Sequence, residues 1–211
     1  MKHLHTLYAP ELVTAFKAAL PALRQKISCI PFAERDARLG IGGNTFRAYQ
    51  NWNNAPSVVY REWASVVSDT IEPHRLATVI ASSDGFSSWH VSLADDLQRH
   101  WLARQGQCLS FAHLHKLIDL YVKWLSRYNF GSAEFTNAIV SHANCALDSQ
   151  TINKMNQCLS LALPLSNPSM GDIHSRVTYN FCQEVIEDFA AAQGGTRLLF
   201  DYFAWQPGGG A

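Results

Sequence analysis

The sequence predicts an all-α protein, and three observations lead to this prediction. Six long segments place apolar residues three and four positions apart, the spacing that lines one face of a helix. No segment alternates apolar and polar residues over the length of a strand. Loop-forming residues separate the helical segments, as in "LGIGGN" and "NNAP". With 47% hydrophobic residues, the 211-residue chain is expected to bury a well-formed core, as one domain or two closely packed lobes.

The expected helices follow one another along the chain. Pro21 is expected to kink or divide the first helix, because proline lacks the N–H that the helical hydrogen bonds need. Asp148 or Ser149 is expected to cap the fifth, since either side chain accepts hydrogen bonds from free backbone N–H groups. Loops at "LSNPSMGD" and "QGG" separate the last segments. The six expected helices are 9–27, 57–71, 87–105, 111–128, 148–163 and 176–193.

The charges of the chain balance, with 17 Lys and Arg against 17 Asp and Glu, so the whole chain lacks the basic excess typical of nucleic-acid-binding domains. Residues 97–133 are its basic part. A basic segment in a neutral chain could line a basic cleft, and it is equally compatible with positive charges dispersed over the surface. The basic residues of this part are Arg99, Arg104, Lys116, Lys123 and Arg127, against Asp119 alone.

Several classes of protein and site are not expected. No apolar run is long enough to span a bilayer, and the N-terminus lacks the apolar core of a signal peptide, so we expect a cytoplasmic protein without a membrane partner. The five widely spaced cysteines include no C-x-x-C pair and are expected to be buried thiols. The segment "GIGGN" lacks the strand and lysine of a phosphate loop, so an ordinary loop is expected. No metal or other cofactor is expected, because the nine histidines form no H-E-x-x-H pair.

Three segments carry residues that could take part in catalysis or binding, and each also has an ordinary structural explanation. "FAHLHKLIDLYVKWLSRY" places Lys116, Asp119 and Lys123 opposite an apolar stripe, where a solvated surface is the usual pattern. "HANCALDSQTI" places Asp148 at a helix start, where capping alone is a common role. "LLFDYFAWQ" places Asp201 four residues before Trp205, which is typical of a surface aspartate and a core tryptophan.

In this order the three segments resemble the helix-hairpin-helix DNA glycosylases, most closely the archaeal 8-oxoguanine glycosylase branch. That branch has Q-K-x-x-x-x-x-x-K, which "HKLIDLYVK" matches with Lys116 and Lys123. It then has P-x-D at a helix start, which "CALDSQTI" resembles with Asp148, and D-x-x-x-W, which matches Asp201 and Trp205. The resemblance covers the second half of the chain. Ala146 stands where the branch has proline, and the L-P-G-V-G hairpin of mainstream members is absent.

The resemblance implies catalytic roles for Lys116 and Asp148. Lys116 would attack the anomeric carbon, and Asp148 would stabilise the positive charge that develops on the sugar as the base leaves. Two alternatives stay open: Lys116 pairs with Asp119 one turn away and contacts only phosphate or sugar, or Asp148 directs a water without a covalent step. The other implied contacts are Trp89 (in "SSWHVSL"), Asp201, Tyr202 and Trp205 with the extruded base, and Lys123 and Arg127 with DNA.

The resemblance also implies a fold and a substrate. The fold would be two helical lobes with the active site in the cleft between them, a single glycosylase-like domain over residues 1–206, with 207–211 as a flexible tail. The same order resembles bacterial proteins that include an anti-phage glycosylase removing glucosylated hydroxymethylcytosine from phage DNA. DNA carrying modified bases is therefore the expected partner, with no obligate protein partner. The alternatives are 8-oxoguanine excision, with or without strand cleavage, and a non-catalytic helical DNA-binding protein.

Overall fold

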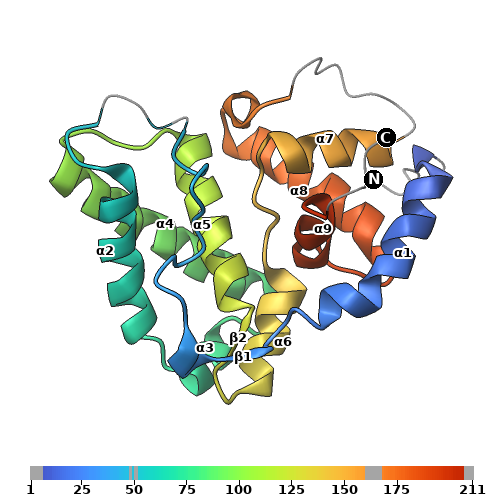
Figure 1. The fold of residues 1–211 in the computed structure, drawn as a ribbon, viewed down its shortest axis with the longest axis horizontal. Coiled ribbons are helices and arrows are strands. Elements are labelled where there is room, and N and C mark those ends of the chain that lie inside the picture. Colours follow the sequence, from blue (N-terminus) through green and yellow to red (C-terminus); the bar gives the residue numbers. More distant parts are fainter. Residues whose placement is uncertain (1–6, 48, 50–51, 160–167, 207–211) are drawn as a thin grey trace.

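The computed structural model describes residues 7–47, 49, 52–159 and 168–206, and they form a helical structure (Figure 1). Nine α-helices lie within these ranges, so the all-α prediction is confirmed. The expected tail at 207–211 lies outside the described residues. The helices are α1 (Pro10–Arg24), α2 (Pro56–Asp69), α3 (Pro73–Val79), α4 (Ser83–Gln105), α5 (Phe111–Leu125), α6 (Ala133–His142), α7 (Ser149–Cys158), α8 (Arg176–Ala191) and α9 (Arg197–Ala204).

Each helix starts at a residue suited to that position. Helices α1, α2 and α3 begin with proline, whose fixed φ suits the first turn and whose missing N–H would have no helical partner there. The other six begin after a side chain that accepts a hydrogen bond from a free backbone N–H. The predicted cap at Asp148 is confirmed. The six capping residues are Ser82, Ser110, Ser132, Asp148, Ser175 and Thr196.

All six expected helices are present in the described residues, although the fifth was expected to continue to residue 163, beyond the described part. Pro21 does not divide α1, which continues through it to Arg24. Only three residues of the helix follow it, so the one hydrogen bond that Pro21 cannot donate is lost near the helix end. The sequence did not indicate α3, α6 and α9, which have 7, 10 and 8 residues. Helices this short depend on packing for their stability and show little periodicity of their own.

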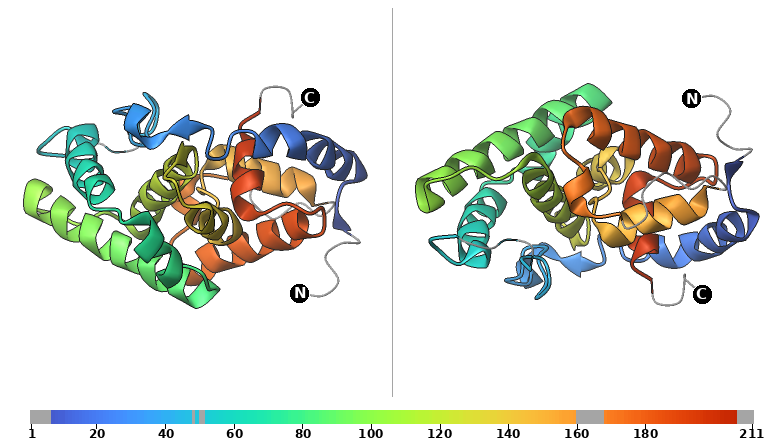
Figure 2. Two further views of the ribbon diagram at one scale, coloured as in Figure 1. Left: turned by 90° about the horizontal axis from the view of Figure 1, so that it is seen from below. Right: turned by 90° about the horizontal axis from the view of Figure 1, so that it is seen from above.

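The helices pack in two groups, which Figures 1 and 2 show on either side of the segment joining α6 to α7. In one group α4 packs against α2, α3 and α5. In the other, α9 packs against α1, α7 and α8. Helix α6 contacts α3 and α4 on one side and α9 on the other, so it connects the groups.

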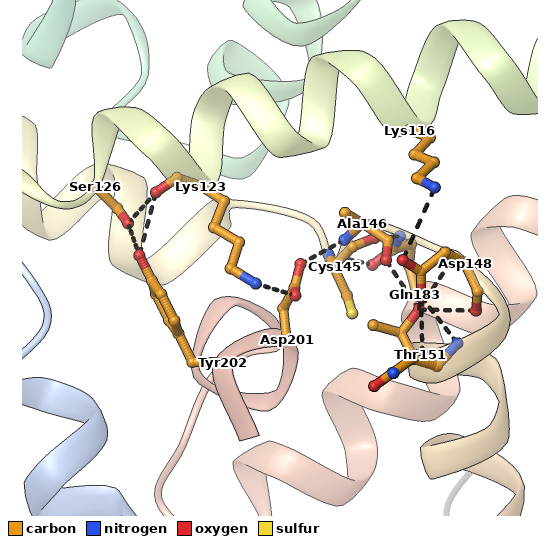
Figure 3. Close-up of polar contacts among 11 residues, drawn as sticks. Lys116, Lys123, Ser126, Cys145, Ala146, Asp148, Thr151, Gln183, Asp201 and Tyr202 are labelled. Atoms are coloured by element: carbon orange, nitrogen blue, oxygen red, sulfur yellow. Dashed lines mark hydrogen bonds and ion pairs between the residues drawn. The ribbon is translucent and has the colours of Figure 1, made fainter. Parts of the chain in front are cut away.

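Helix α5 forms the inner wall of its group. Its predicted apolar stripe is confirmed, since Leu117, Ile118 and Tyr121 are completely buried. Burying side chains of this size contributes roughly 1.5–3 kcal/mol each. The opposite face is not the solvated strip that its charges suggest, because Lys116 and Lys123 point toward the second group of helices, where they meet Asp148 and Asp201 (Figure 3).

A short parallel pairing joins the segment after α1 to the end of α5. Strand β1 (Ile30–Pro31) pairs with β2 (Tyr128–Asn129), with Ile30 opposite Tyr128. Just before it, Ser28 donates its backbone N–H to the carbonyl of Ser126 at 2.8 Å. The sequence showed no alternation here because two residues per strand are too few to produce one. The pairing holds residues 25–29 beside the C-terminal half of α5.

The cysteine prediction needs a correction. Cys145, Cys158 and Cys182 are buried thiols as expected, whereas Cys29 and Cys108 are exposed. Both exposed cysteines lie in connecting segments, where no helix face turns their side chains inward. In the described part of the chain, no helix combines the length and apolar character needed to cross a membrane.

Candidate functional site

A cleft of about 760 Å³ opens between α5, the start of α7, the end of α9 and the segment from Gln25 to Thr45. It lies where the two groups of helices face each other. Six of the eight site residues predicted from the sequence line it: Lys116, Lys123, Arg127, Asp148, Tyr202 and Trp205.

Lys116 and Asp148 face each other across the cleft (Figure 3). The distance from Lys116 Nζ to Asp148 Oδ2 is 3.9 Å, and the two side chains are 14% and 10% exposed. The pair therefore has limited access to solvent and lacks the short contact of a tight ion pair. A group that enters the cleft can approach the amine and the carboxylate together.

The two oxygens of Asp148 have different partners. Oδ1 caps α7 by accepting the backbone N–H groups of Gln150 and Thr151, each at 3.0 Å. Oδ2 is the oxygen nearest to Lys116. Thr151 completes a capping box by accepting the backbone N–H of Asp148 at 2.8 Å. The cap thus fixes the direction of the carboxylate while one oxygen points to the cleft, so capping and chemistry are compatible in one residue.

The loop before Asp148 is held by two buried side chains (Figure 3). Gln183 of α8 accepts the backbone N–H of Cys145 at 2.9 Å and donates to the carbonyl of the same residue at 2.7 Å. Asp201 of α9 accepts the N–H of Ala146 at 2.8 Å through Oδ2. Because these bonds are buried, they restrict the loop that presents Asp148 to the cleft.

Asp201 lies beneath the cleft and supports the loop before Asp148. The resemblance implied instead that Asp201 contacts the extruded base. The Asp201 side chain is completely buried and forms an ion pair with Lys123. Burial raises the pKa of Asp201, while the charge and hydrogen bond of Lys123 and the N–H of Ala146 oppose the rise. Since both oxygens are engaged and Asp201 does not line the cleft, a bound base is out of its direct reach.

Asp119 does not pair with Lys116. It is completely buried on the side of α5 that faces α4 and α8, where His90 Nε2 lies 2.8 Å from Oδ1. The hydroxyl of Tyr179 donates to the same carboxylate, at 2.8 Å from Oδ2. Its partners come from α4 and α8, so the spacing along α5 alone could not reveal that the carboxylate turns away from Lys116.

Tyr202 and Trp205 form an aromatic wall at the end of α9. The Tyr202 hydroxyl lies 3.1 Å from Ser126 Oγ, and Lys123 Nζ lies 4.7 Å from the centre of its ring. Burial raises the pKa of Tyr202, so the phenol stays protonated. Trp205 is 48% exposed, which leaves its ring available to a ligand and excludes the core position that its spacing suggested.

Trp89 is outside this site. It lies on α4 with its ring 5.5 Å from that of Phe86 and does not line the cleft formed by the described residues. The predicted contact between Trp89 and an extruded base is therefore not compatible with this arrangement of helices.

The cleft carries more positive than negative charge, with Lys26, Arg38, Lys116, Lys123 and Arg127 against Asp36 and Asp148. Arg127 Nη1 lies 3.9 Å from Asp36 Oδ2, a separation that weakens the pair. The predicted basic region divides, because Arg99 and Arg104 form ion pairs with Asp96 and Glu62 elsewhere. An anionic ligand such as a phosphodiester would be attracted to this surface.

The segment before α2 supplies cleft residues that the sequence analysis did not identify. Lys26 and Arg38 add positive charge, and residues 40–45 of the Gly-rich loop form one wall. Gly40 has φ +92°, and a Cβ there would lie 2.5 Å from the carbonyl oxygen of Leu120. The loop approaches α5 so closely that only glycine fits. Conformationally special glycines at "LGIGGN" were the one signal in the sequence.

No set of three or more His, Cys, Asp or Glu side chains within the described ranges is arranged to hold a metal ion. No family model, no curated protein and no solved structure matches the chain. The amine–carboxylate pair, the aromatic wall and the positive charge of the cleft are the features from which its chemistry can be argued.

Proposed function

We propose that the protein is a DNA glycosylase that extrudes a modified base into this cleft and cleaves its N-glycosidic bond. One observation carries the proposal: Lys116 and Asp148 lie 3.9 Å apart in a cleft that also contains an exposed tryptophan and an excess of positive charge. A nucleophile, a fixed carboxylate, a stacking surface and a cationic lining are the four parts that base excision requires. In this proposal the two groups of helices correspond to the two lobes of the glycosylase fold.

In the proposed reaction the neutral amine of Lys116 attacks C1′ of the nucleotide. The N–C1′ bond forms as the glycosidic bond breaks, and the bonding electrons leave with the base, which takes up a proton. While ionised, Asp148 Oδ2 stabilises the positive charge that develops on the sugar. Once the N–C1′ bond has formed, the same oxygen is placed to accept a proton from the new secondary ammonium. Ring opening then gives a Schiff base, whose hydrolysis releases the abasic strand and regenerates the amine.

The aromatic wall supports extrusion of the base. Removing a base from the duplex costs a few kcal/mol, and stacking on an aromatic ring offsets this by about 1–3 kcal/mol. Trp205 is sufficiently exposed to stack, and Tyr202 beside it is held by Ser126. Lys26, Arg38 and Arg127 are suited to contact flanking phosphates, because they line the cleft without lying at the Lys116–Asp148 pair.

The resemblance favours glucosylated hydroxymethylcytosine of phage DNA as the substrate, with 8-oxoguanine as the alternative. A cleft of about 760 Å³ is within the range of roughly 300–1,000 Å³ that holds drug-sized ligands. It offers more room than a bare base needs, which supports the larger of the two substrates.

The experiment is to incubate the purified protein with phage DNA that carries glucosylated bases, with oligonucleotides containing 8-oxoguanine, and with unmodified DNA. Abasic sites are then quantified. The proposal expects abasic sites on one modified DNA and a background level on unmodified DNA. Equal signals on all three would contradict it.

A protein that binds DNA without cleaving it is the second candidate, favoured by the cationic excess of the cleft. It predicts a DNA affinity that falls steeply with salt, because bound phosphates release counterions, and no abasic product from any substrate. Measuring binding and abasic sites on the same DNA samples separates the two functions.

A further inference from the structure

A second groove, of about 270 Å³, lies between α4 and α8 on another face of α5. None of the described residues that line it also lines the cleft. His90 and His115 lie at its buried floor, and Arg176 and Asn180 of α8 lie at its exposed rim. The groove is therefore a separate site, and inferences about it are independent of the proposed glycosylase activity.

His115 at the floor is a buried polar group without a complete set of partners. It is 4% exposed, and its Nδ1 has no hydrogen-bond partner in the described part of the structure. Its ring is surrounded by Phe111, at 4.0 Å between ring centres, and Tyr179, at 5.0 Å. A buried polar atom left without a partner costs about 1–3 kcal/mol, which a ligand hydrogen bond would offset. Nδ1 has less than 1 Å² of accessible surface, so a ligand hydroxyl reaches it only when the side chains around it shift.

His115 offers hydrogen bonds and not charge at neutral pH. Burial lowers its pKa to about 4, with Asp119 opposing the shift and His90 and Arg176 adding to it. A neutral imidazole has one donor and one acceptor. The ligand group that best matches this imidazole is an uncharged polar group such as a hydroxyl.

The rim has the features of an anion site. Arg176 is the first residue of the 16-residue helix α8, so it lies at the positive end of the helix dipole. It is exposed and, within the described ranges, has no carboxylate oxygen within 4 Å. Asn180 lies one turn further along the same helix and also lines the groove.

At the opposite end of the groove, the positive charge of Arg197 is already paired. Arg197 forms an ion pair with Glu187 at 3.3 Å and donates to the carbonyl of His142 at 2.8 Å. Glu184 on the rim between the two ends would repel a second negative charge. The electrostatics therefore favour a ligand with one anionic end, at Arg176, and an uncharged remainder.

We propose that this groove binds a small molecule through a phosphate or carboxylate group held by Arg176 and the start of α8, with an uncharged hydroxyl-bearing part that reaches His115. The groove volume limits the ligand to the size of a small metabolite. Gln183 lines the groove and also holds Cys145, so a ligand here would adjoin the loop that carries Asp148.

The test is a titration of the full chain with inorganic phosphate, acetate and ribose 5-phosphate, at constant ionic strength set with sodium chloride, followed by calorimetry. Saturable binding of ribose 5-phosphate that exceeds binding of inorganic phosphate is the expected result, and saturable acetate binding would identify a carboxylate ligand instead. Arg176→Gln is expected to weaken binding about tenfold or more, as for a lost charge-assisted hydrogen bond. His115→Phe should weaken ribose 5-phosphate more than inorganic phosphate.

Lys116→Gln is the matched control, because it removes a cation from the cleft and leaves the groove unchanged. It should retain the binding of ribose 5-phosphate. Loss of binding in Lys116→Gln together with retention in Arg176→Gln would locate the anion in the cleft and overturn the proposal, as would the absence of saturable binding. Arg176 is exposed, so its variant keeps the test decisive even if His115→Phe does not fold.

Discussion

Two lysine–aspartate pairs share helix α5, and they differ in burial and in contact. Lys116 and Asp148 lie 3.9 Å apart at the cleft surface, and the carboxylate oxygen facing the amine has no closer partner among the described residues. Lys123 and Asp201 form a closer pair, with an aspartate that is completely buried and whose second oxygen accepts the N–H of Ala146. The same residue types, two turns apart on one helix, thus occupy different environments.

The difference shows how a scaffold pair can be distinguished from a reactive pair. A buried carboxylate with every oxygen engaged cannot change its partners during a reaction without exposing an unpaired charge. A carboxylate with one oxygen held by a helix cap and the other directed to the cleft keeps its orientation and stays available. The pair Lys123–Asp201 would therefore maintain the geometry in which Lys116–Asp148 reacts.

The largest expected effect is on stability, from Lys123→Met. Methionine approximates the length of the lysine stem but leaves Asp201 buried without its cation. Breaking such a pair typically costs about 3–5 kcal/mol of unfolding free energy, measured by denaturant or thermal unfolding. Lys116→Met is the matched control and should cost less than about 1 kcal/mol, because its pair is longer and Asp148 keeps the backbone hydrogen bonds of the cap without it. Equal losses in the two variants would remove the distinction between the pairs.

Lys116→Gln should have the next largest effect, on activity. With the nucleophile removed, base release is expected to fall about 100-fold or more, while the unfolding free energy changes little. Borohydride should trap a covalent protein–DNA adduct with the wild-type protein and none with the variant. Base release without any trapped adduct, and only a partial defect in Lys116→Gln, would instead assign the reaction to a water directed by Asp148.

Trp205→Ala tests whether the exposed ring belongs to the site. Loss of stacking should weaken binding of DNA that carries the modified base by about 1–3 kcal/mol, measured by equilibrium titration. The thermal midpoint should hardly change, because the side chain is 48% exposed. Trp89→Ala serves as the control and should leave DNA binding unaltered. A large loss of stability in Trp205→Ala with unchanged DNA binding would show that Trp205 supports the fold and does not contact the base.

A comparable effect is expected from a change in the Gly-rich loop. Gly40→Ala places a Cβ 2.5 Å from the carbonyl oxygen of Leu120 at a positive φ, so it should cost about 1–3 kcal/mol of unfolding free energy and displace the cleft wall. Gly43→Ala, whose Cβ would meet no atom within 4 Å, should be close to neutral. Similar stability and DNA affinity in the two variants would show that the close approach to α5 does not shape the cleft.

Patterns among neighbouring residues predicted the buried helix face and the helix cap, which depend only on the local sequence. The stripe through Leu117 and Tyr121 and the cap at Asp148 require only neighbouring residues, and both are confirmed. The partners of the charged side chains did not follow from spacing. Asp119 turns toward His90, and Lys123 pairs with Asp201, 78 residues away, because tertiary packing decides which side chains meet.

The motif order led to six residues that line the cleft, namely Lys116, Lys123, Arg127, Asp148, Tyr202 and Trp205. It could not indicate the contribution of the segment from Gln25 to Thr45. That segment has no helical periodicity, and its position depends on the two-residue pairing of Ile30 with Tyr128. Trp89 was misplaced for the same reason, since its distance from the cleft is set by the packing of α4 against its neighbours.

The most direct test of the central claim is the single-turnover rate of base release by Asp148→Asn, measured as abasic sites on the modified DNA that the wild-type protein cleaves. Asparagine retains the oxygen that caps α7 and removes the negative charge. The account predicts a rate at least about 100-fold below wild type, with unfolding free energy and DNA affinity nearly unchanged. A folded Asp148→Asn protein that releases the base at the wild-type rate would contradict it.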